Sequence, residues 1–334
     1  MTLSGLKRVL ITGATGFAGL SLALNLAASG YRVRALVRNR EKATLLHQAG
    51  VDTVVGDILD SQILRQAVHG TDTVYHLAAV FRQAGVPDSE YREVHVDATK
   101  HLVELSAAAD VRRVVHCSTV GVHGSVAAED APATEDAPFR PGDIYQLTKL
   151  QGEEIARETA DRLGVPLTVV RPGAIYGPGD RRLLKIIGGV AKRRFALLGD
   201  GSPHLHMIYV DDLIEGFKLA AESASAAGRV YIIAGNEAPT LNELVREIAE
   251  IAHVKGPPFR LPIWPFLMAG TLCEAVCVPF GIEPPIYRRR VKFFTSNRWF
   301  DTSRARAELG FTAKMPLRDG IQRTLDSYRH LGWV

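Results

Sequence analysis

Cysteine is scarce in this 334-residue sequence, and a secretion signal and a membrane-spanning run are both missing from it. Its three cysteines, Cys117, Cys273 and Cys277, cannot form a fully paired set of disulfides. The first residues lack the apolar core of a signal peptide, and the most apolar stretch, residues 261–286, is interrupted by five prolines and two glutamates. These absences favour a reducing compartment, and we expect the protein to be cytoplasmic.

Neither sign of charge dominates the chain. Lys and Arg number 40 against 36 Asp and Glu, and the positive charges are spread along the sequence, which gives little support to nucleic-acid binding. Apolar residues make up 46% and charged residues 23%, which excludes wholesale disorder, a coiled-coil rod and a collagen-like fibre. The histidines and cysteines lack the spacing of a metal site, so we expect no metal.

Short β-rich runs alternate with longer helical patterns in the first half of the chain. The alternation predicts an α/β fold with a doubly wound parallel sheet of Rossmann type, which binds ligands at the carboxyl ends of its strands. The runs predicted to form these strands are Arg8–Thr12, Arg32–Val37, 53–55, 73–77, Arg113–Cys117 and 167–170.

From residue 173 onward the alternation fades, and glycine and proline become frequent. We therefore expect a smaller, interleaved, C-terminal part that binds the substrate. The dinucleotide-binding domain is predicted over residues 1–172 with residues 207–235 added to it, and the substrate-binding part over residues 173–206 and 236–334. Residues 207–210 and Val230–Ile233 are predicted to be strands that return to the main sheet.

A glycine-rich turn over residues 12–19 joins the first predicted strand to an apolar helix over residues 20–28. Its glycines permit a tight turn, close approach of backbone N–H groups to a pyrophosphate, and close packing of the helix on the strand. The strand–turn–helix context favours a dinucleotide site over a simple tight loop. Cofactor contacts are expected from Gly13, Thr15, Gly16, Phe17, Ala18 and Gly19.

Two further positions bear on which cofactor is bound. Arg38 follows the second predicted strand, where an NAD-preferring site usually carries an acid for the ribose 2′-OH. Arginine suits a 2′-phosphate instead, so NADP is favoured over NAD. Asp57, followed by Ile58, lies after the third strand and can accept a hydrogen bond from the adenine amine; a helix N-cap is the competing interpretation, which fits Asp60 better.

Tyr145 and Lys149 are four residues apart at the start of a predicted helix, so their side chains share one face. Lys149, together with an oxidised nicotinamide, should favour the tyrosinate and bring Tyr145 nearer to working pH as a general acid/base. Ser118 and Thr119 follow the fifth predicted strand, at the sheet edge where a nicotinamide would lie. A hydroxyl there can orient a substrate oxygen.

Taken together, the motifs resemble the extended short-chain dehydrogenase/reductase family, also called the NAD-dependent epimerase/dehydratase family. The resemblance covers nearly the whole chain, and its motifs are Gly13-x-x-Gly16-x-x-Gly19, Asp57, Leu77-Ala78-Ala79, Ser118-Thr119 followed by Gly124, Tyr145-x-x-x-Lys149, Arg171-Pro172-Gly173 and Val210-Asp211-Asp212-Leu213.

The resemblance implies roles for individual residues. Tyr145 would exchange the proton, Lys149 would hold the nicotinamide ribose, and Thr119 would bind the reacting oxygen, with Ser118 as the second choice. Further cofactor contacts would come from Leu77, Ala78, Ala79, Pro172, Gly173 and Ile175. The resemblance also suggests a homodimer packed through helices near residues 90–108 and 145–163.

Departures from the family pattern bear on the substrate. Ala174 stands where many nucleotide-sugar enzymes of the family have an asparagine that contacts the diphosphate, and alanine offers no side-chain donor. The motif style is closest to the 3β-hydroxysteroid dehydrogenase-like branch. This similarity implies an NAD(P)-dependent oxidoreductase acting on a secondary alcohol or ketone of a largely apolar, steroid-, terpenoid- or flavonoid-like substrate. The alternatives are a nucleotide-sugar epimerase or dehydratase with tightly bound NAD, and a non-catalytic cofactor-sensing protein.

Two other features stay open at the level of sequence. His95 stands where the family usually has a supporting asparagine, and it could replace that amide, lie in the interior, or relay a proton. The apolar segment 261–287 could form either a wall of the substrate site or the core of the small domain. Because Arg288-Arg289-Arg290 follows it, a peripheral membrane contact is a further hypothesis.

Overall fold

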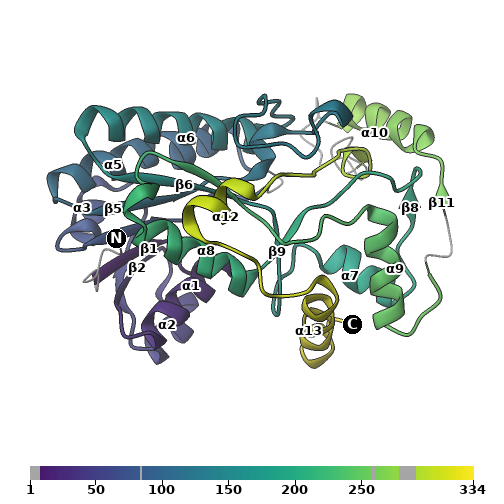
Figure 1. Cartoon of the computed structure of the whole chain (residues 1–334), viewed down its shortest axis with the longest axis horizontal. Coiled ribbons are helices and arrows are strands. Elements are labelled where there is room, and N and C mark those ends of the chain that lie inside the picture. The colour runs from purple at the N-terminus through teal and green to yellow at the C-terminus, as the bar shows by residue number, and fades with distance from the viewer. Residues whose placement is uncertain (1–7, 83–84, 257–259, 278–290) are drawn as a thin grey trace.

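The computed structural model describes residues 8–82, 85–256, 260–277 and 291–334. Its centre is a seven-stranded sheet in which every pairing is parallel (Figure 1). The strand order β10-β6-β5-β4-β1-β2-β3 confirms the predicted Rossmann-type α/β fold. The strands are β1 (Arg8–Thr12), β2 (Arg32–Val37), β3 (Asp52–Val55), β4 (Thr73–His76), β5 (Arg113–Cys117), β6 (Leu167–Pro172) and β10 (Val230–Ile233).

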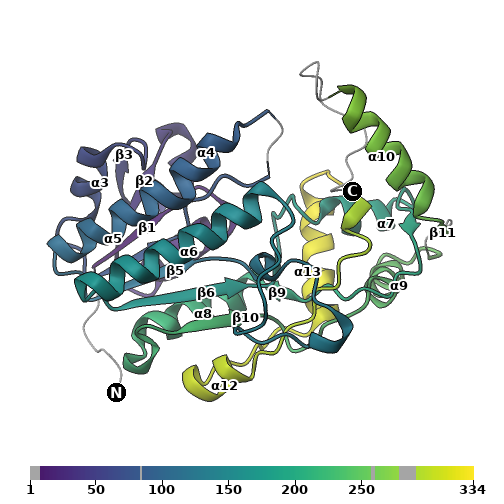
Figure 2. The same ribbon diagram turned by 90° about the horizontal axis from the view of Figure 1, so that it is seen from above.

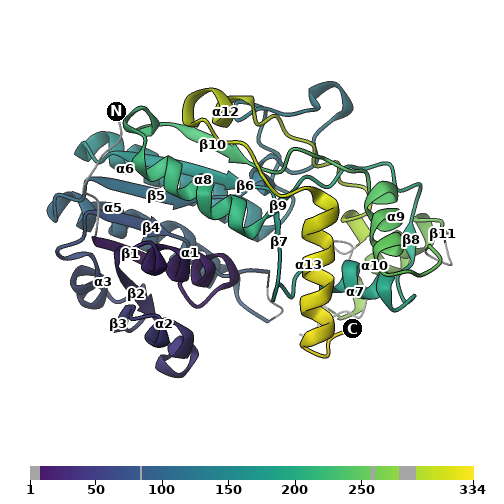
Figure 3. The ribbon, with the colours of Figure 1, turned by 60° about the horizontal axis from the view of Figure 1, so that its bottom comes forward.

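Helices cover both faces of this sheet because each of them has an apolar face. In α1 (Phe17–Ala28), the buried residues Gly19, Leu22, Ala23 and Leu26 recur at helical spacing. Figure 3 shows α1 beside α8 (Val210–Glu222) on one face, where α2 (Thr44–Gln48) also packs. Figure 2 shows the opposite face, covered by α5 (Ala98–Ala108) and α6 (Ile144–Leu163), with α3 (Ser61–Val68) packed on α5.

A second, smaller sheet begins where the chain leaves β6. The main-chain N–H of Gly173 donates to Ile233 O of β10, whereas the next N–H, of Ala174, donates to His206 O. From that point β7 (Ala174–Tyr176) pairs with β9 (Met207–Tyr209). Prediction of residues 207–210 as a strand of the main sheet is therefore wrong, while Val230–Ile233 does return to it. A Cβ at Gly173 would lie 2.8 Å from His206 O, so the switch of partners needs glycine.

The rest of the C-terminal part is mainly helical. Figure 1 shows α7 (Leu184–Ala191), α9 (Leu241–Ile251) and α13 (Leu317–His330) gathered beyond the end of the main sheet. A two-stranded sheet joins β8 (Leu197–Leu198) to β11 (Arg260–Leu261), and α10 (Trp264–Cys277) lies at the periphery (Figure 2). The short helices are α4 (Asp88–Arg92), α12 (Ser303–Leu309), η1 (Arg40–Ala43), η2 (Glu93–Asp97), η3 (Val120–His123), η4 (Ala128–Asp130) and η5 (Ala224–Ala226).

A buried ion pair anchors the carboxyl end of β6. The Arg171 guanidinium donates from Nη2 to Glu153 Oε1 at 2.5 Å and from Nε to Oε2 at 3.0 Å, and both side chains are almost fully buried. Its Nη1 donates to Glu135 O at 2.7 Å and to His123 Nε2 at 3.1 Å. All three guanidinium nitrogens are thus bonded, which a buried arginine requires.

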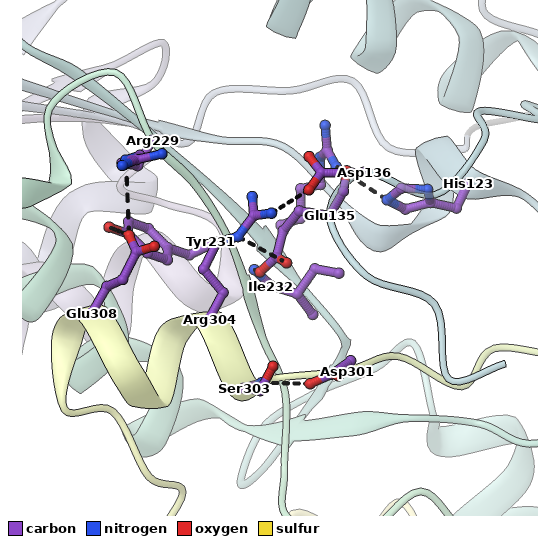
Figure 4. Close-up of polar contacts among 11 residues, drawn as sticks. His123, Glu135, Asp136, Arg229, Tyr231, Ile232, Asp301, Ser303, Arg304 and Glu308 are labelled. Atoms are coloured by element: carbon purple, nitrogen blue, oxygen red, sulfur yellow. Dashed lines mark hydrogen bonds and ion pairs between the residues drawn. The ribbon is translucent and has the colours of Figure 1, made fainter. Parts of the chain in front are cut away.

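The Glu135 side chain connects the outer strand of the sheet to the C-terminal part. Its Oε1 accepts the Ile232 N–H of the edge strand β10 at 2.9 Å, and its Oε2 lies 3.5 Å from Arg304 Nε of α12 (Figure 4). Arg304 also pairs with Asp136. The carboxylate therefore bonds a main-chain N–H on the outer side of β10, which no strand of the described chain pairs.

Candidate functional site

The glycine-rich turn is shaped for a phosphate group. Gly13 has φ +73°, and a Cβ there would lie 2.7 Å from Ala78 N; a Cβ at Gly19 would lie 2.2 Å from Gly13 O. Gly16 caps α1 without a side-chain hydrogen bond, so the first N–H groups of the helix keep their donors for a ligand. Thr15 is exposed, and Phe17 and Ala18 are half-buried beside it. This donor set fits the pyrophosphate of a dinucleotide.

The end of β4 lies directly against this turn. Leu77 N donates to Thr12 O at 3.2 Å, and Ala78 N donates to Thr12 Oγ1 at 3.2 Å. Thr12 Oγ1 is in turn bonded to His76 Nδ1 at 2.8 Å in the core. Leu77 and Ala78 are half-buried, and Ala79 is exposed. The bonds from Leu77 and Ala78 to Thr12 place this predicted contact segment beside the glycine-rich turn.

Arg38 and Asp57 lie at the ends of neighbouring strands, β2 and β3. Both side chains are exposed, whereas Ile58 is buried. Within the described residues Arg38 has no hydrogen-bond or ion-pair partner, so its guanidinium is free for a phosphate. Among the residues that the structure describes, Asp57 Oδ1 accepts the Leu59 N–H alone. The N-cap of α3 is Asp60, whose Oδ1 accepts Gln62 N and Ile63 N. The capping role therefore belongs to Asp60.

Tyr145 and Lys149 lie in the first turns of α6, which Asp143 caps by accepting the Gln146 N–H. Lys149 Nζ donates to Cys117 O at 2.7 Å, at the carboxyl end of β5, and burial lowers the pKa of this lysine. Tyr145 is half-buried, and burial raises its pKa to about 12. The positive charges of Arg82 and Arg182 act against burial and lower the pKa of Tyr145.

The two candidate hydroxyls differ in exposure. Thr119 is half-buried, and its Oγ1 accepts the Gly121 N–H at 3.0 Å, which leaves its own O–H to donate to a ligand. Ser118 is 3% exposed, and its Oγ has no hydrogen-bond partner within the described residues. This difference favours Thr119 as the group that contacts a substrate oxygen.

The remaining predicted contacts lie along the neighbouring strand. Pro172 ends β6, Gly173 makes the switch to the second sheet, and Ile175 lies in β7. Ser118 N donates to Val170 O at 2.8 Å, so the ends of β5 and β6 are adjacent. The structure thus brings the glycine turn, the end of β4, Thr119 and the Tyr145–Lys149 pair together at the carboxyl ends of the parallel strands.

His95 supports Tyr145 without relaying protons. Its Nε2 accepts the Val80 N–H at 3.0 Å, so Nδ1 must donate to Thr148 Oγ1, 2.8 Å away. Burial lowers the pKa of His95 to about 3, and the ring packs edge-to-face on Tyr145 with centroids 5.6 Å apart. The ring thus offers the protein one acceptor and one donor, as the side-chain amide of an asparagine at this position would.

The neutral state of His95 makes stability depend on pH. Its pKa is about 3 in the fold, against 6.5 for an ordinary histidine, so the unfolded chain takes up a proton that the fold does not as pH drops below 6.5. Between pH 6 and pH 4, we expect the free energy of unfolding to fall less steeply in His95→Asn than in the wild type. The difference in slope should be about 1.4 kcal/mol per pH unit. Urea unfolding at several pH values measures this, with His69→Asn, on the surface, as control. Equal slopes for wild type and His95→Asn would show that His95 is charged in the fold.

The sequence did not point to a set of arginines around Tyr145. Arg82 Cζ lies 4.9 Å from the centre of the Tyr145 ring, and its Nε donates to Asp143 Oδ2 at 2.6 Å. Phe81 packs edge-to-face on the same ring. Arg182 bonds Asp180 at 2.8 Å and Ile175 O at 3.3 Å. In the sequence, the one indication that Arg82 lies near the site is its position, three residues after the Leu77-Ala78-Ala79 motif.

The apolar segment 261–287 does not form the core of the small domain over its described part. In α10, Trp264, Met268, Leu272 and Val276 are between 55% and 67% exposed. Gly270 is the only buried residue of this helix. The exposed side chains correct the core interpretation. Phe280 and the three arginines at 288–290 lie outside the described residues.

Two other binding features, a bilayer-spanning helix and a metal cluster, are absent from the described residues. None of their helices has the length and apolar character needed to cross a bilayer. Nor do they contain a group of three or more His, Cys, Asp or Glu side chains arranged to hold a metal ion.

Residues 9–234 match the model of the NAD dependent epimerase/dehydratase family, and the chain belongs to this family. The resemblance to the extended short-chain dehydrogenases/reductases is thereby confirmed. The protein is accordingly an enzyme of a class that comprises NAD-dependent dehydrogenases, reductases and epimerases.

Individual relatives span different substrates. An N-acetyl-alpha-D-glucosaminyl-diphospho-ditrans,octacis-undecaprenol 4-epimerase of Escherichia coli O157:H7 is 30% identical over 95% of this chain and 94% of its own. A 3-beta-hydroxysteroid dehydrogenase of Mycolicibacterium neoaurum is 29% identical over 98% of this chain and 92% of its own. The solved structure of MoeE5 in complex with UDP-glucuronic acid and NAD is 28% identical, with a TM-score of 0.76, over 97% of this chain and 99% of its own.

Proposed function

We propose that this protein transfers a hydride to or from a secondary alcohol or ketone on a largely apolar substrate, with a nicotinamide cofactor. The observation that carries the proposal is that Thr119, Tyr145 and Lys149 lie at the carboxyl ends of the strands, on the same side of the sheet as the glycine turn. Ala174 supports an apolar substrate, because this position in β7 offers no donor to a sugar diphosphate.

Each side chain has a distinct task in this reaction. A bound nicotinamide supplies or accepts the hydride at its C4 carbon. Thr119 donates its O–H to the substrate oxygen, and Tyr145 exchanges the proton with that oxygen. Lys149, held by Cys117 O, keeps two further N–H donors for the cofactor ribose, and its positive charge counters the developing tyrosinate.

We assign NADP as the preferred cofactor because of Arg38. Its exposed guanidinium at the end of β2, with no partner among the described side chains, suits a 2′-phosphate. Asp57, exposed at the end of the neighbouring strand, would accept a hydrogen bond from the adenine amine.

A thermal-shift screen with NADP or NAD tests both the substrate class and the cofactor. A ligand at 100 times its Kd stabilises the native state by about 2.7 kcal/mol, which raises Tm. We expect hydroxysteroids, terpenoid alcohols or flavonoid ketones to stabilise the protein and to be turned over. NADP should raise Tm more than NAD, and Arg38→Ala should remove this difference. Stabilisation by UDP-sugars alone would overturn the apolar-substrate proposal.

The alternative is a nucleotide-sugar epimerase or dehydratase, in which the hydride leaves and returns within one cycle. The relative from Escherichia coli O157:H7 is a 4-epimerase, which supports this reading. It predicts tightly bound NAD and no net change in cofactor redox state during turnover. A purely cofactor-sensing protein is disfavoured by the Thr119, Tyr145 and Lys149 set.

A homodimer through α5 and α6 is also proposed. The two helices lie side by side on an outer face of the molecule (Figure 2), and Leu147, Gln151 and Ile155 recur every four residues on α6 with partial exposure. Light scattering after gel filtration should give twice the 36.4 kDa of one chain; a monomer mass would refute the dimer.

The exposed stripe of α10 supports a peripheral membrane contact of a cytoplasmic enzyme. Trp264, Met268, Leu272 and Val276 recur every fourth residue, so their exposed apolar side chains share one face of the helix. Co-flotation with vesicles that contain anionic lipids tests this contact. Absence of flotation would remove the membrane from the proposal.

A further inference from the structure

The glycine-rich turn and the helix that follows it supply hydrogen-bond donors but no positive charge. Residues 12–28 contain no charged side chain, and Gly16 caps α1 without a side-chain hydrogen bond. A pyrophosphate, both of whose phosphates are ionised near neutral pH, would meet only main-chain N–H groups and the dipole of α1 from this stretch. A cation that balances its charge has to come from another segment.

Arg182 brings a guanidinium group to this turn. Its Cζ lies 5.3 Å from the centre of the ring of Phe17, the first residue of α1. The segment that carries Arg182 follows β7, and it meets Phe17 at a second point, because a Cβ at Gly177 would lie 3.5 Å from Phe17 Cζ. These two contacts place residues 177–182 against the start of α1.

The same guanidinium also lies beside the aromatic side chains around Tyr145. Arg182 Cζ is 5.9 Å from the centre of the Phe81 ring, and that ring packs edge-to-face on Tyr145 with centroids 5.3 Å apart. Arg182 therefore contacts both the start of the cofactor turn and the neighbour of the catalytic tyrosine. A dinucleotide with its pyrophosphate at the turn and its nicotinamide at Tyr145 would span this interval.

Asp180 fixes the orientation of Arg182. Its buried carboxylate accepts Arg182 Nε at 2.8 Å, and it also accepts the Arg182 N–H at 3.2 Å and the Leu183 N–H at 3.0 Å. Arg182 Nη2 donates to Ile175 O at 3.3 Å, and Nη1 has no hydrogen-bond partner among the described residues. The side chain is 33% exposed. The guanidinium is thus held in place by Nε, while its Nη groups keep donors for an anion.

We propose that Arg182 binds the pyrophosphate of the nicotinamide dinucleotide, and so ties the C-terminal part of the chain to the cofactor turn. The inference rests on the nicotinamide cofactor of the proposed function, but not on its substrate. It is also independent of the choice between NADP and NAD, because both contain the same pyrophosphate. Arg38 would distinguish the two cofactors, whereas Arg182 would bind what they share.

Two simpler roles of Arg182 have to be separated from this one. Its charge lowers the pKa of Tyr145, so its removal would slow turnover even without a contact to the cofactor. Binding measured without substrate is not affected by that role. Packing on the rings of Phe17 and Phe81 is the second role, and it depends on the planar guanidinium. Lysine keeps the charge but not the planar group, so Arg182→Lys separates a phosphate contact from packing.

The test measures the Kd values of NADP, NAD and ADP-ribose by titration calorimetry in the absence of substrate. We expect Arg182→Gln to weaken all three by about 10- to 100-fold, as the loss of a charge-assisted hydrogen bond predicts. Arg182→Lys should bind them about fivefold more tightly than Arg182→Gln, because an ammonium still attracts a phosphate. Arg181→Gln is the matched control. This neighbouring arginine lies over the Trp333 ring instead, and its loss should change each Kd by less than about twofold.

Three results would overturn the contact with the pyrophosphate. They are unchanged Kd values in Arg182→Gln, a weakening that spares ADP-ribose, and equal weakening by Gln and Lys together with a lower Tm of the cofactor-free variants. Failure of the proposed function looks different. In that case Arg182→Gln still weakens all three ligands, but no apolar alcohol or ketone is turned over, or Arg38→Ala leaves the ratio of the NADP and NAD affinities unchanged.

Discussion

Replacing Tyr145 by Phe should lower kcat by about 10²- to 10⁴-fold, the usual contribution of a positioned acid/base. Phenylalanine keeps the ring contacts with Phe81, His95 and Arg82 and removes only the hydroxyl. We therefore expect Tm and cofactor affinity to change little. Initial rates of NAD(P)H formation with a turned-over alcohol, measured beside thermal unfolding, check both expectations.

Tyr328→Phe is the matched control for this variant. Tyr328 is a fully buried tyrosine of α13, and its hydroxyl has no hydrogen-bond partner within the described chain. Its loss should leave kcat within about twofold, as expected of a hydroxyl outside the machinery. If Tyr145→Phe keeps more than a tenth of the wild-type kcat, another group moves the proton and the acid/base assignment fails.

The features that the sequence predicted correctly come from local patterns. The strands at Arg8–Thr12, Arg32–Val37 and Arg113–Cys117 have the predicted bounds, because buried parallel strands are short apolar runs between turns. The glycine turn was also predicted from the sequence, because the positive φ at Gly13 and the close contact at Gly19 exclude a side chain and so require glycine. Residue spacing also placed Tyr145 and Lys149 together in the first turns of α6.

Features that depend on distant partners were not readable in this way. The Arg82–Asp143 bond joins residues 61 positions apart, and neither residue belongs to a periodic pattern. Strand β9 was predicted correctly as a strand, but its partner is decided by a main-chain switch at Gly173. The apolar composition of α10 did not reveal that Trp264 and Met268 face outward, because composition does not say what covers a helix.

Replacing Glu153 by Gln should lower the free energy of unfolding by about 3–5 kcal/mol, because it leaves the Arg171 charge buried without its carboxylate. The amide keeps the volume of the side chain, so the loss is electrostatic and not due to a cavity. The remaining partners of Arg171, the Glu135 carbonyl and His123 Nε2, are neutral acceptors. Urea unfolding at pH 7 measures the change.

Glu104→Gln provides the matched comparison, since Glu104 pairs with Arg162 at 3.6 Å on the surface and should change stability by less than about 1 kcal/mol. If Glu153→Gln does not fold, the double variant Arg171→Met and Glu153→Met removes both charges, and it should recover folding if the unpaired charge is the cause. A loss below about 1 kcal/mol in Glu153→Gln would mean that the neutral acceptors suffice for Arg171. Arg171 also bonds the carbonyl of Glu135, whose side chain connects β10 to α12 (Figure 4). If Glu153→Gln loses more than about 5 kcal/mol, we therefore expect the contact between α12 and the edge strand β10 to be lost as well.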